Sequence, residues 1–166
     1  MSPNEIHNPR PCANEAFSTS NLPVPLYSLH GGGPNLAAFC SGTNAQVYCM
    51  LTRALQTTLT GVDTQSWLSK PEAVEMTKRL MLEVISVGQR CGVPLEEELV
   101  SVLLERINSI PGIYSSMYVD AKEGRRLEVD VILGYPVKRA KDFGMDVPTL
   151  ATLYALLKAV DGRLGK

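Results

Sequence analysis

The side chains suited to nucleophilic or metal chemistry in this 166-residue chain are scattered along the sequence. The four cysteines form no Cys-x-x-Cys pair, and neither histidine stands at metal-ligand spacing from them: Cys12, Cys40, Cys49 and Cys91. Structural zinc sites draw their Cys and His ligands from closely spaced pairs. We therefore expect neither a zinc site nor a disulfide framework, and we expect Cys91 to be a small packed side chain.

A glycine-rich motif, His30-Gly31-Gly32-Gly33, is similar to the oxyanion-hole motif of some lipases and esterases. Those enzymes also need a Gly-x-Ser-x-Gly nucleophile elbow and a histidine later in the chain. The sequence has no such elbow and no histidine after His30. A flexible glycine loop is therefore the preferred interpretation of this motif.

Composition excludes several classes of partner. The net charge is -1, with 20% charged and 45% hydrophobic residues, and no stretch concentrates Lys or Arg. A nucleic-acid partner therefore has no electrostatic footprint. No apolar run approaches the roughly 20 residues that span a bilayer, and the polar, proline-bearing N-terminus lacks the apolar core of a signal peptide. The sequence predicts a cytoplasmic protein with no membrane partner.

Two segments of different character make up the chain. Residues 1–44 contain six of the eleven prolines, both histidines and only three charged residues. Proline at this density opposes helix, so we predict a poorly ordered tail with a short extended piece near residues 24–29. Residues 45–166 have helical apolar spacing and no convincing alternation with period two. This second segment is predicted to be an all-α domain of about six helices.

Local signals predict where those helices begin and end. Gly61 and Gly92 are placed to end the first two long helices, and Ser69 with Glu72 is typical of a capping box at the start of the second. Later helices are expected over residues 95–107, 113–120 and 125–143, with a bend at residues 134–136. A last helix should follow Gly144, with Pro148 in its first turn.

The order and spacing of several short motifs resemble the C-terminal domain of the ketopantoate reductase family. The similarity covers roughly residues 45–162, and the segments that carry it are Ser115-Ser116-Met117 with Asp120, Glu128-Val129-Asp130 with Gly134, and Gly144 with Val147-Pro148. The resemblance implies a helical domain like that of 6-phosphogluconate-dehydrogenase-like reductases. It also implies NADPH as the cofactor of the whole protein, a small 2-keto acid (2-dehydropantoate) as substrate, and dimerisation through helical surfaces.

The chemistry that the family performs gives each site residue a role. Hydride addition to a ketone leaves an alkoxide that must be protonated or stabilised by a positive donor. In the family a Lys on the first helix does this, and two Asn on the following turns line the substrate. By similarity, Ser116 would hydrogen-bond the substrate and Glu128 would hold polar groups of the cleft. Taken without the resemblance, Ser116 could instead cap a short helix, and Glu128 could pair with a nearby arginine.

The chain departs from the family pattern in two respects. Gln46 stands where the Lys is expected, and Met50 and Ala54 stand where the two Asn are expected. Neither Gln, Met nor Ala can replace the missing ammonium and amides. No strand–glycine turn–helix unit with a Gly-x-Gly-x-x-Gly motif is present to hold NADPH, so we expect no Rossmann domain and no cofactor held by this chain alone.

Three functional hypotheses remain open from the sequence. In the first, the chain is the substrate-binding and dimerisation domain of a reductase, truncated and inactive by itself, with a Rossmann-domain partner or a second copy as its partner. Alternatively, it is a stand-alone helical module that binds a protein or small molecule without redox chemistry. In a third interpretation the cleft serves acid–base isomerase or cyclase chemistry, with Glu128 as its acid or base.

Overall fold

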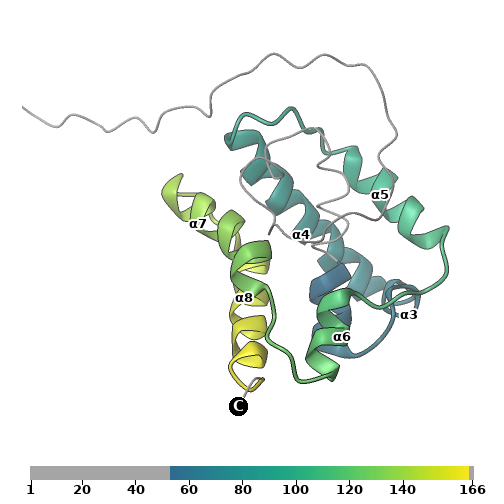
Figure 1. Cartoon of the computed structure of the whole chain (residues 1–166). Coiled ribbons are helices and arrows are strands. Elements are labelled where there is room, and N and C mark those ends of the chain that lie inside the picture. Colours follow the sequence, from purple (N-terminus) through teal and green to yellow (C-terminus); the bar gives the residue numbers. More distant parts are fainter. Residues whose placement is uncertain (1–52, 165–166) are drawn as a thin grey trace, which may run out of the picture.

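The computed structural model describes residues 53–164, and every regular element in this range is a helix (Figure 1). Residues 53–60 are helical, and the elements that follow are α3 (Thr64–Leu68), α4 (Pro71–Arg90), α5 (Leu99–Asn108), α6 (Ser116–Lys122), the π-helix η1 (Asp130–Gly134), α7 (Tyr135–Asp142) and α8 (Pro148–Asp161). The all-α prediction is therefore confirmed. The predicted tail, the extended piece, Gln46 and Met50 lie outside the described residues.

Helix α4 is the centre around which the domain packs. It contacts α3, α5, α7 and α8, and in Figure 1 it runs through the middle of the fold. Its buried residues recur every three or four positions, from Ala73 and Thr77 to Val87 and Gly88. This spacing places them on one broad face of a 3.6-residue helix, so the sequence pattern is sufficient to explain why α4 is enclosed by other elements.

One continuous apolar core holds the elements together. Side chains from the first helix, α4, η1 and α8 are almost completely buried, for example Leu55, Leu80, Leu133, Leu150 and Leu157. Burying a leucine side chain contributes about 1.5–3 kcal/mol each. The Cys91 thiol is free and buried next to this core, which confirms the prediction of a packed cysteine. None of the described helices is long and apolar enough to cross a bilayer.

The glycine signals for helix ends are confirmed where the backbone turns left-handed. Gly92 has φ of 87°, and the N–H of Val93 donates to the carbonyl of Gly88 at 3.0 Å to close the end of α4. Gly144 has φ of 64° and follows α7 in the same manner. A Cβ is strained in this region of φ, which explains glycine at both positions. Pro148 begins α8 as predicted.

The predicted capping box at the start of α4 is wrong. The N-cap is Lys70, which makes no side-chain capping bond. Ser69 instead belongs to the end of the short helix α3, where its N–H donates to Gln65 and its hydroxyl donates to the carbonyl of Ser66 at 2.7 Å. Helix α3 was not predicted. Because Ser69 closes the end of α3, it is not the N-cap of α4 that the sequence motif suggested.

Three predicted helices differ in extent from those observed. Helix α6 spans Ser116–Lys122, whereas the sequence predicted a helix over residues 113–120. Helix α5 begins at Leu99 rather than near residue 95, because the carbonyl of Leu95 accepts the side-chain amide of Gln89 at 2.7 Å and the chain turns before Leu99. The helix predicted over residues 125–143 is divided: residues 125–128 are irregular, and η1 and α7 follow. The predicted bend at residues 134–136 lies where η1 passes into α7.

Candidate functional site

Ser116 is the first residue of α6, and its side chain is exposed. The capping role that the sequence left open for it belongs to the preceding residue. Ser115 has extended backbone angles, and its hydroxyl accepts the N–H of Tyr118 at 3.1 Å. Among the described residues no hydrogen bond engages the Ser116 hydroxyl, so it is available to a ligand.

A chain of hydroxyl groups fixes the start of α6 against the first helix. Thr57 is fully buried, and its hydroxyl donates to the carbonyl of Arg53 at 2.9 Å. Because that hydrogen is used, the Ser115 hydroxyl is the donor in the 2.8 Å contact with the Thr57 oxygen. The N–H of Ser115 also donates to Thr57, at 3.3 Å. Tyr118, Ser115, Thr57 and Arg53 are thereby joined in one directed series of hydrogen bonds, which places Ser116 beside the first helix.

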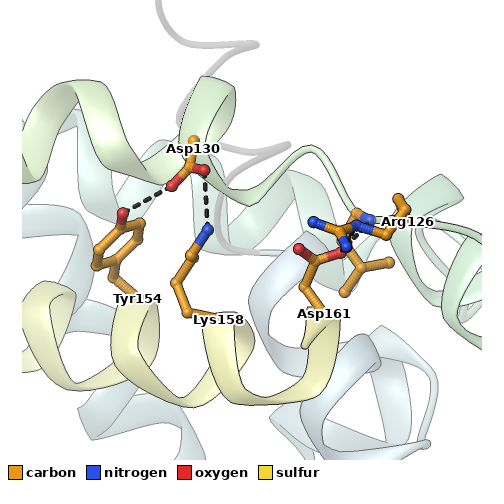
Figure 2. Close-up of polar contacts among 6 residues, drawn as sticks. Arg126, Asp130, Tyr154, Lys158 and Asp161 are labelled. Atoms are coloured by element: carbon orange, nitrogen blue, oxygen red, sulfur yellow. Dashed lines mark hydrogen bonds and ion pairs between the residues drawn. The ribbon is translucent and has the colours of Figure 1, made fainter. Parts of the chain in front are cut away.

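Glu128 lies just before η1, with its side chain exposed and its backbone held on both sides. Its carbonyl accepts the N–H of Ile132 at 3.0 Å. The N–H of the preceding residue, Leu127, donates to the buried carboxylate of Asp161 at 2.8 Å. Asp161 also pairs with Arg126 at 3.3 Å, and Figure 2 shows this contact at the end of α8.

The arginine pairing considered for Glu128 is not formed. Arg125 pairs with Asp120 and Glu123, and Arg126 pairs with Asp161. Within residues 53–164 no side chain forms an ion pair or hydrogen bond with the Glu128 carboxylate. No hydrogen bond joins the side chains of Ser116 and Glu128 within these described residues, so they do not form a hydrogen-bonded pair.

A polar cluster next to Glu128 fastens η1 to α8. The Asp130 carboxylate accepts the Tyr154 hydroxyl at 2.7 Å and the Lys158 ammonium at 2.8 Å, as Figure 2 shows. Lys158, and then Tyr154, lower the pKa of Asp130. In return, the Asp130 carboxylate raises the pKa of both Tyr154 and Lys158. The raised pKa values favour the protonated phenol and ammonium that donate to Asp130, as expected of a contact that joins η1 to α8.

Arg53 is a residue that the sequence reasoning missed. Its side chain is half-buried, its Nε is buried, and among the described residues that atom has no hydrogen-bond partner and no carboxylate pairs with the guanidinium. The sequence did contain a signal, because Arg53 is the only Lys or Arg between Arg10 and Lys70. No group of His, Cys, Asp and Glu within residues 53–164 is arranged to hold a metal ion.

Comparisons with known proteins identify the family to which this domain is similar. The family model for the ketopantoate reductase PanE/ApbA C-terminal domain matches residues 47–161. The uncharacterized protein YDL144C of Saccharomyces cerevisiae is 34% identical over 113 residues, which cover 65% of this chain and 32% of that protein. The 2-dehydropantoate 2-reductase of Nostoc is 31% identical over 88 residues, covering 53% of this chain and 28% of the enzyme.

A solved structure supports the same assignment at the level of the fold. The dimeric ketopantoate reductase of Staphylococcus aureus superposes with a TM-score of 0.68 at 25% identity, over 80% of this chain and 45% of that protein. The chain thus spans about a third of the two sequence relatives and less than half of the structural one. On this evidence the chain belongs to the ketopantoate reductase family, and residues 47–161 correspond to the C-terminal domain of that family.

Proposed function

We propose that this chain is the substrate-side domain of an NADPH-dependent reductase of small 2-keto acids, with 2-dehydropantoate as the family precedent, and that it requires a separate nucleotide-binding domain for catalysis. The observation that carries the proposal is the position of Ser116. Its hydroxyl is exposed and free at the start of α6, and the Thr57–Ser115 hydrogen bonds hold it beside the first helix. A free hydroxyl on a residue whose neighbour is fixed in this manner is suited to hydrogen-bond a keto acid.

The described part of the chain does not fit the cofactor. The pyrophosphate of a dinucleotide is held where a strand turns through glycines into a helix. Residues 53–164 contain no strand, and therefore no such turn. The nucleotide-binding function is accordingly proposed to lie outside residues 53–164, and this domain is assigned the task of holding and orienting the substrate.

The proposed roles of the two site residues follow from their chemistry. The Ser116 hydroxyl would donate to a substrate oxygen, and the Glu128 carboxylate would accept from a substrate hydroxyl. Both side chains are exposed and unengaged among the described residues, so neither must break an existing bond to bind. Protonation of the product alkoxide has no assigned donor here, because Gln46 stands at the position of the family Lys.

Binding measurements on the purified 166-residue chain test the proposal. We expect 2-dehydropantoate to shift the backbone amide resonances of Ser116 and Glu128 in a saturable titration, and we expect Ser116→Ala and Glu128→Gln each to weaken it. The chain alone should show no saturable binding of micromolar NADPH. Ligand shifts confined to other regions would refute the substrate-side assignment, and micromolar NADPH binding would refute the need for a separate domain.

A second function is favoured by the surface around Ser116. Ile113, Tyr114 and Val119 are 37%, 47% and 40% exposed, and the rings of Tyr114 and Tyr118 stack with centroids 4.4 Å apart. Exposed apolar side chains grouped near a functional residue are typical of a surface that another protein covers. A non-redox binding module would use the same surface. Analytical ultracentrifugation distinguishes this case if Tyr114→Ser dissociates a self-association that Ser116→Ala leaves intact.

A further inference from the structure

Arg53 is a cationic residue of the first helix, close in sequence to the positions where the family has its Lys and Asn. It lies three residues after Met50 and seven after Gln46. Residues at these intervals share one face of an α-helix. In the helix that the sequence predicts from about residue 44 onward, this spacing would put Arg53 on the face where the family resemblance places the missing Lys and one of the missing Asn. It is also the only cationic residue in the 59 positions that separate Arg10 from Lys70.

The guanidinium of Arg53 is not compensated within the described part of the chain. Its Nε is buried without a hydrogen-bond partner, and no carboxylate of residues 53–164 forms an ion pair with it. Other arginines of the domain are engaged: Arg79 pairs with Glu75, and Arg125 pairs with Asp120. Partial burial of a charged group without a counter-charge is unfavourable, and an anionic ligand would relieve that cost.

The hydroxyl chain described above connects Arg53 to Ser116. The carbonyl of Arg53 accepts the Thr57 hydroxyl, and the Thr57 oxygen accepts both the hydroxyl and the N–H of Ser115. The backbone of Arg53 is thus two hydrogen bonds away from the residue that precedes Ser116. This connection fixes the backbone of Arg53 relative to the residue that precedes Ser116 at the start of α6.

We propose that Arg53 binds the carboxylate of the 2-keto acid whose oxygen is hydrogen-bonded by Ser116, an assignment that rests on the proposed function. Arginine presents parallel N–H donors that match the two oxygens of a carboxylate, and it stays charged at every physiological pH. It therefore supplies the positive charge that is absent at Gln46 for binding. It does not supply a proton, so it replaces the family Lys in recognition and not in acid catalysis.

The test is an NMR titration of the full chain with 3-methyl-2-oxobutanoate, together with two control compounds. The methyl ester keeps the ketone and removes the negative charge, and 3-methylbutanoate keeps the charge and removes the ketone. We expect the acid to shift the Nε–H resonance of Arg53 and the amide of Ser116 together. The ester should bind at least about tenfold more weakly, because it lacks the charge-assisted bonds.

Matched variants separate a binding role from a structural one. Arg53→Met should weaken the keto acid about tenfold or more and abolish the preference for acid over ester, whereas Arg53→Lys should restore part of both. Arg79→Met removes an exposed arginine on α4 and should change neither. If Arg53→Met fails to fold, the acid and ester comparison and the Arg53 Nε–H shift on the native chain still decide the outcome.

The possible failures can be told apart. If Ser116→Ala weakens the keto acid while Arg53→Met does not, the role of Arg53 is refuted and the proposed function stands. If Arg53→Met weakens 3-methylbutanoate and the keto acid equally and Ser116→Ala has no effect, the carboxylate site stands and the substrate role of Ser116 is refuted. If the acid leaves the Arg53 Nε–H resonance unshifted, the guanidinium does not bind the carboxylate, and this overturns the proposal.

Discussion

The hydrogen bonds between Thr57 and Ser115 should couple the first helix to α6 energetically, and this coupling can be measured. Thr57→Val keeps the shape of a fully buried side chain and removes its oxygen. The N–H and hydroxyl of Ser115 then lose the acceptor that they contact at 3.3 and 2.8 Å. Leaving a donor unpaired costs about 1–3 kcal/mol when it is buried, and the Ser115 donors are partly buried, so we expect a loss of about 1–2 kcal/mol in the free energy of unfolding.

Substitution of Ser115, the partner of Thr57, should cost less unfolding free energy, and the double variant gives the sign of the coupling between the two residues. Ser115→Ala removes the cap on the N–H of Tyr118, for which a loss of about 1 kcal/mol is typical. In the double variant the Ser115 hydroxyl is no longer present to be left unpaired. The combined loss should therefore fall short of the sum of the single losses by about 0.5–1.5 kcal/mol.

Urea denaturation followed by circular dichroism at 222 nm provides the measurement. Thr60→Val is a suitable control, because the Thr60 hydroxyl donates to the carbonyl of Gln56 at 2.6 Å within its own helix and joins no second element. It should cost less than about 0.5 kcal/mol. Strictly additive losses in the double variant, or a Thr57→Val loss no larger than the control, would refute the view that these hydroxyls register α6 against the first helix.

Three further substitutions test contacts elsewhere in the fold. Glu83→Gln should cost about 1–2 kcal/mol in urea denaturation, because the carboxylate accepts the first two free N–H groups of α8 at 3.0 and 2.7 Å. Asp130→Asn should remove part of the acid dependence of thermal stability: Lys158 lowers the pKa of Asp130, so its contribution is present above the unfolded carboxylate pKa of about 3.9 and is lost as the pH falls through the lower folded value. The measurement is the melting temperature as a function of pH. An Asn variant whose melting temperature falls as steeply at acid pH as that of the native chain would contradict this. Gly112→Ala should lower the melting temperature, since its Cβ would lie 2.0 Å from the Oδ1 of Asp63 and displace that side chain from the cap of α3.

The parts of the fold that the sequence predicted depend on local chemistry. Gly92 and Gly144 end helices because the backbone there turns left-handed, and Pro148 starts α8 because its fixed φ suits a first turn. Ser69 misled the prediction for a related reason. Its side chain is equally able to close a preceding helix, and the five-residue α3 is too short to have a clear apolar period.

The parts that the sequence did not predict depend on contacts between distant residues. Glu83 caps α8 from 66 positions away, and Asp161 accepts the N–H of Leu127 across 34 positions. The π-helix η1 is held by Asp130 through two residues of α8. No pattern within one element records these partners, and for this reason the predicted helix over residues 125–143 was continuous while the observed chain is divided.

The candidate site also has a part that the sequence predicted and a part that it did not. Ser116 and Glu128 were found by the spacing of family motifs, and their roles as ligand-binding residues stay predictions. The 58-residue separation between Thr57 and Ser115 concealed the hydrogen bonds that position Ser116. Arg53 matches no motif of the family, whose pattern has a lysine as the cation of the first helix, and its buried Nε is visible only in the folded chain.

These observations separate the scaffold of the family site from its proton chemistry. The fastening of α6 to the first helix depends on two hydroxyl groups that need no cofactor and no ligand. Proton delivery in the family depends on an ammonium at a position where this chain has Gln46. If Arg53 supplies a charge without a transferable proton, substrate binding and ketone reduction become separable properties. The chain should then bind 2-keto acids in preference to their esters, and supplying it with a nucleotide-binding domain should yield far slower reduction than a lysine-bearing relative achieves, because only binding and electrostatic stabilisation would remain.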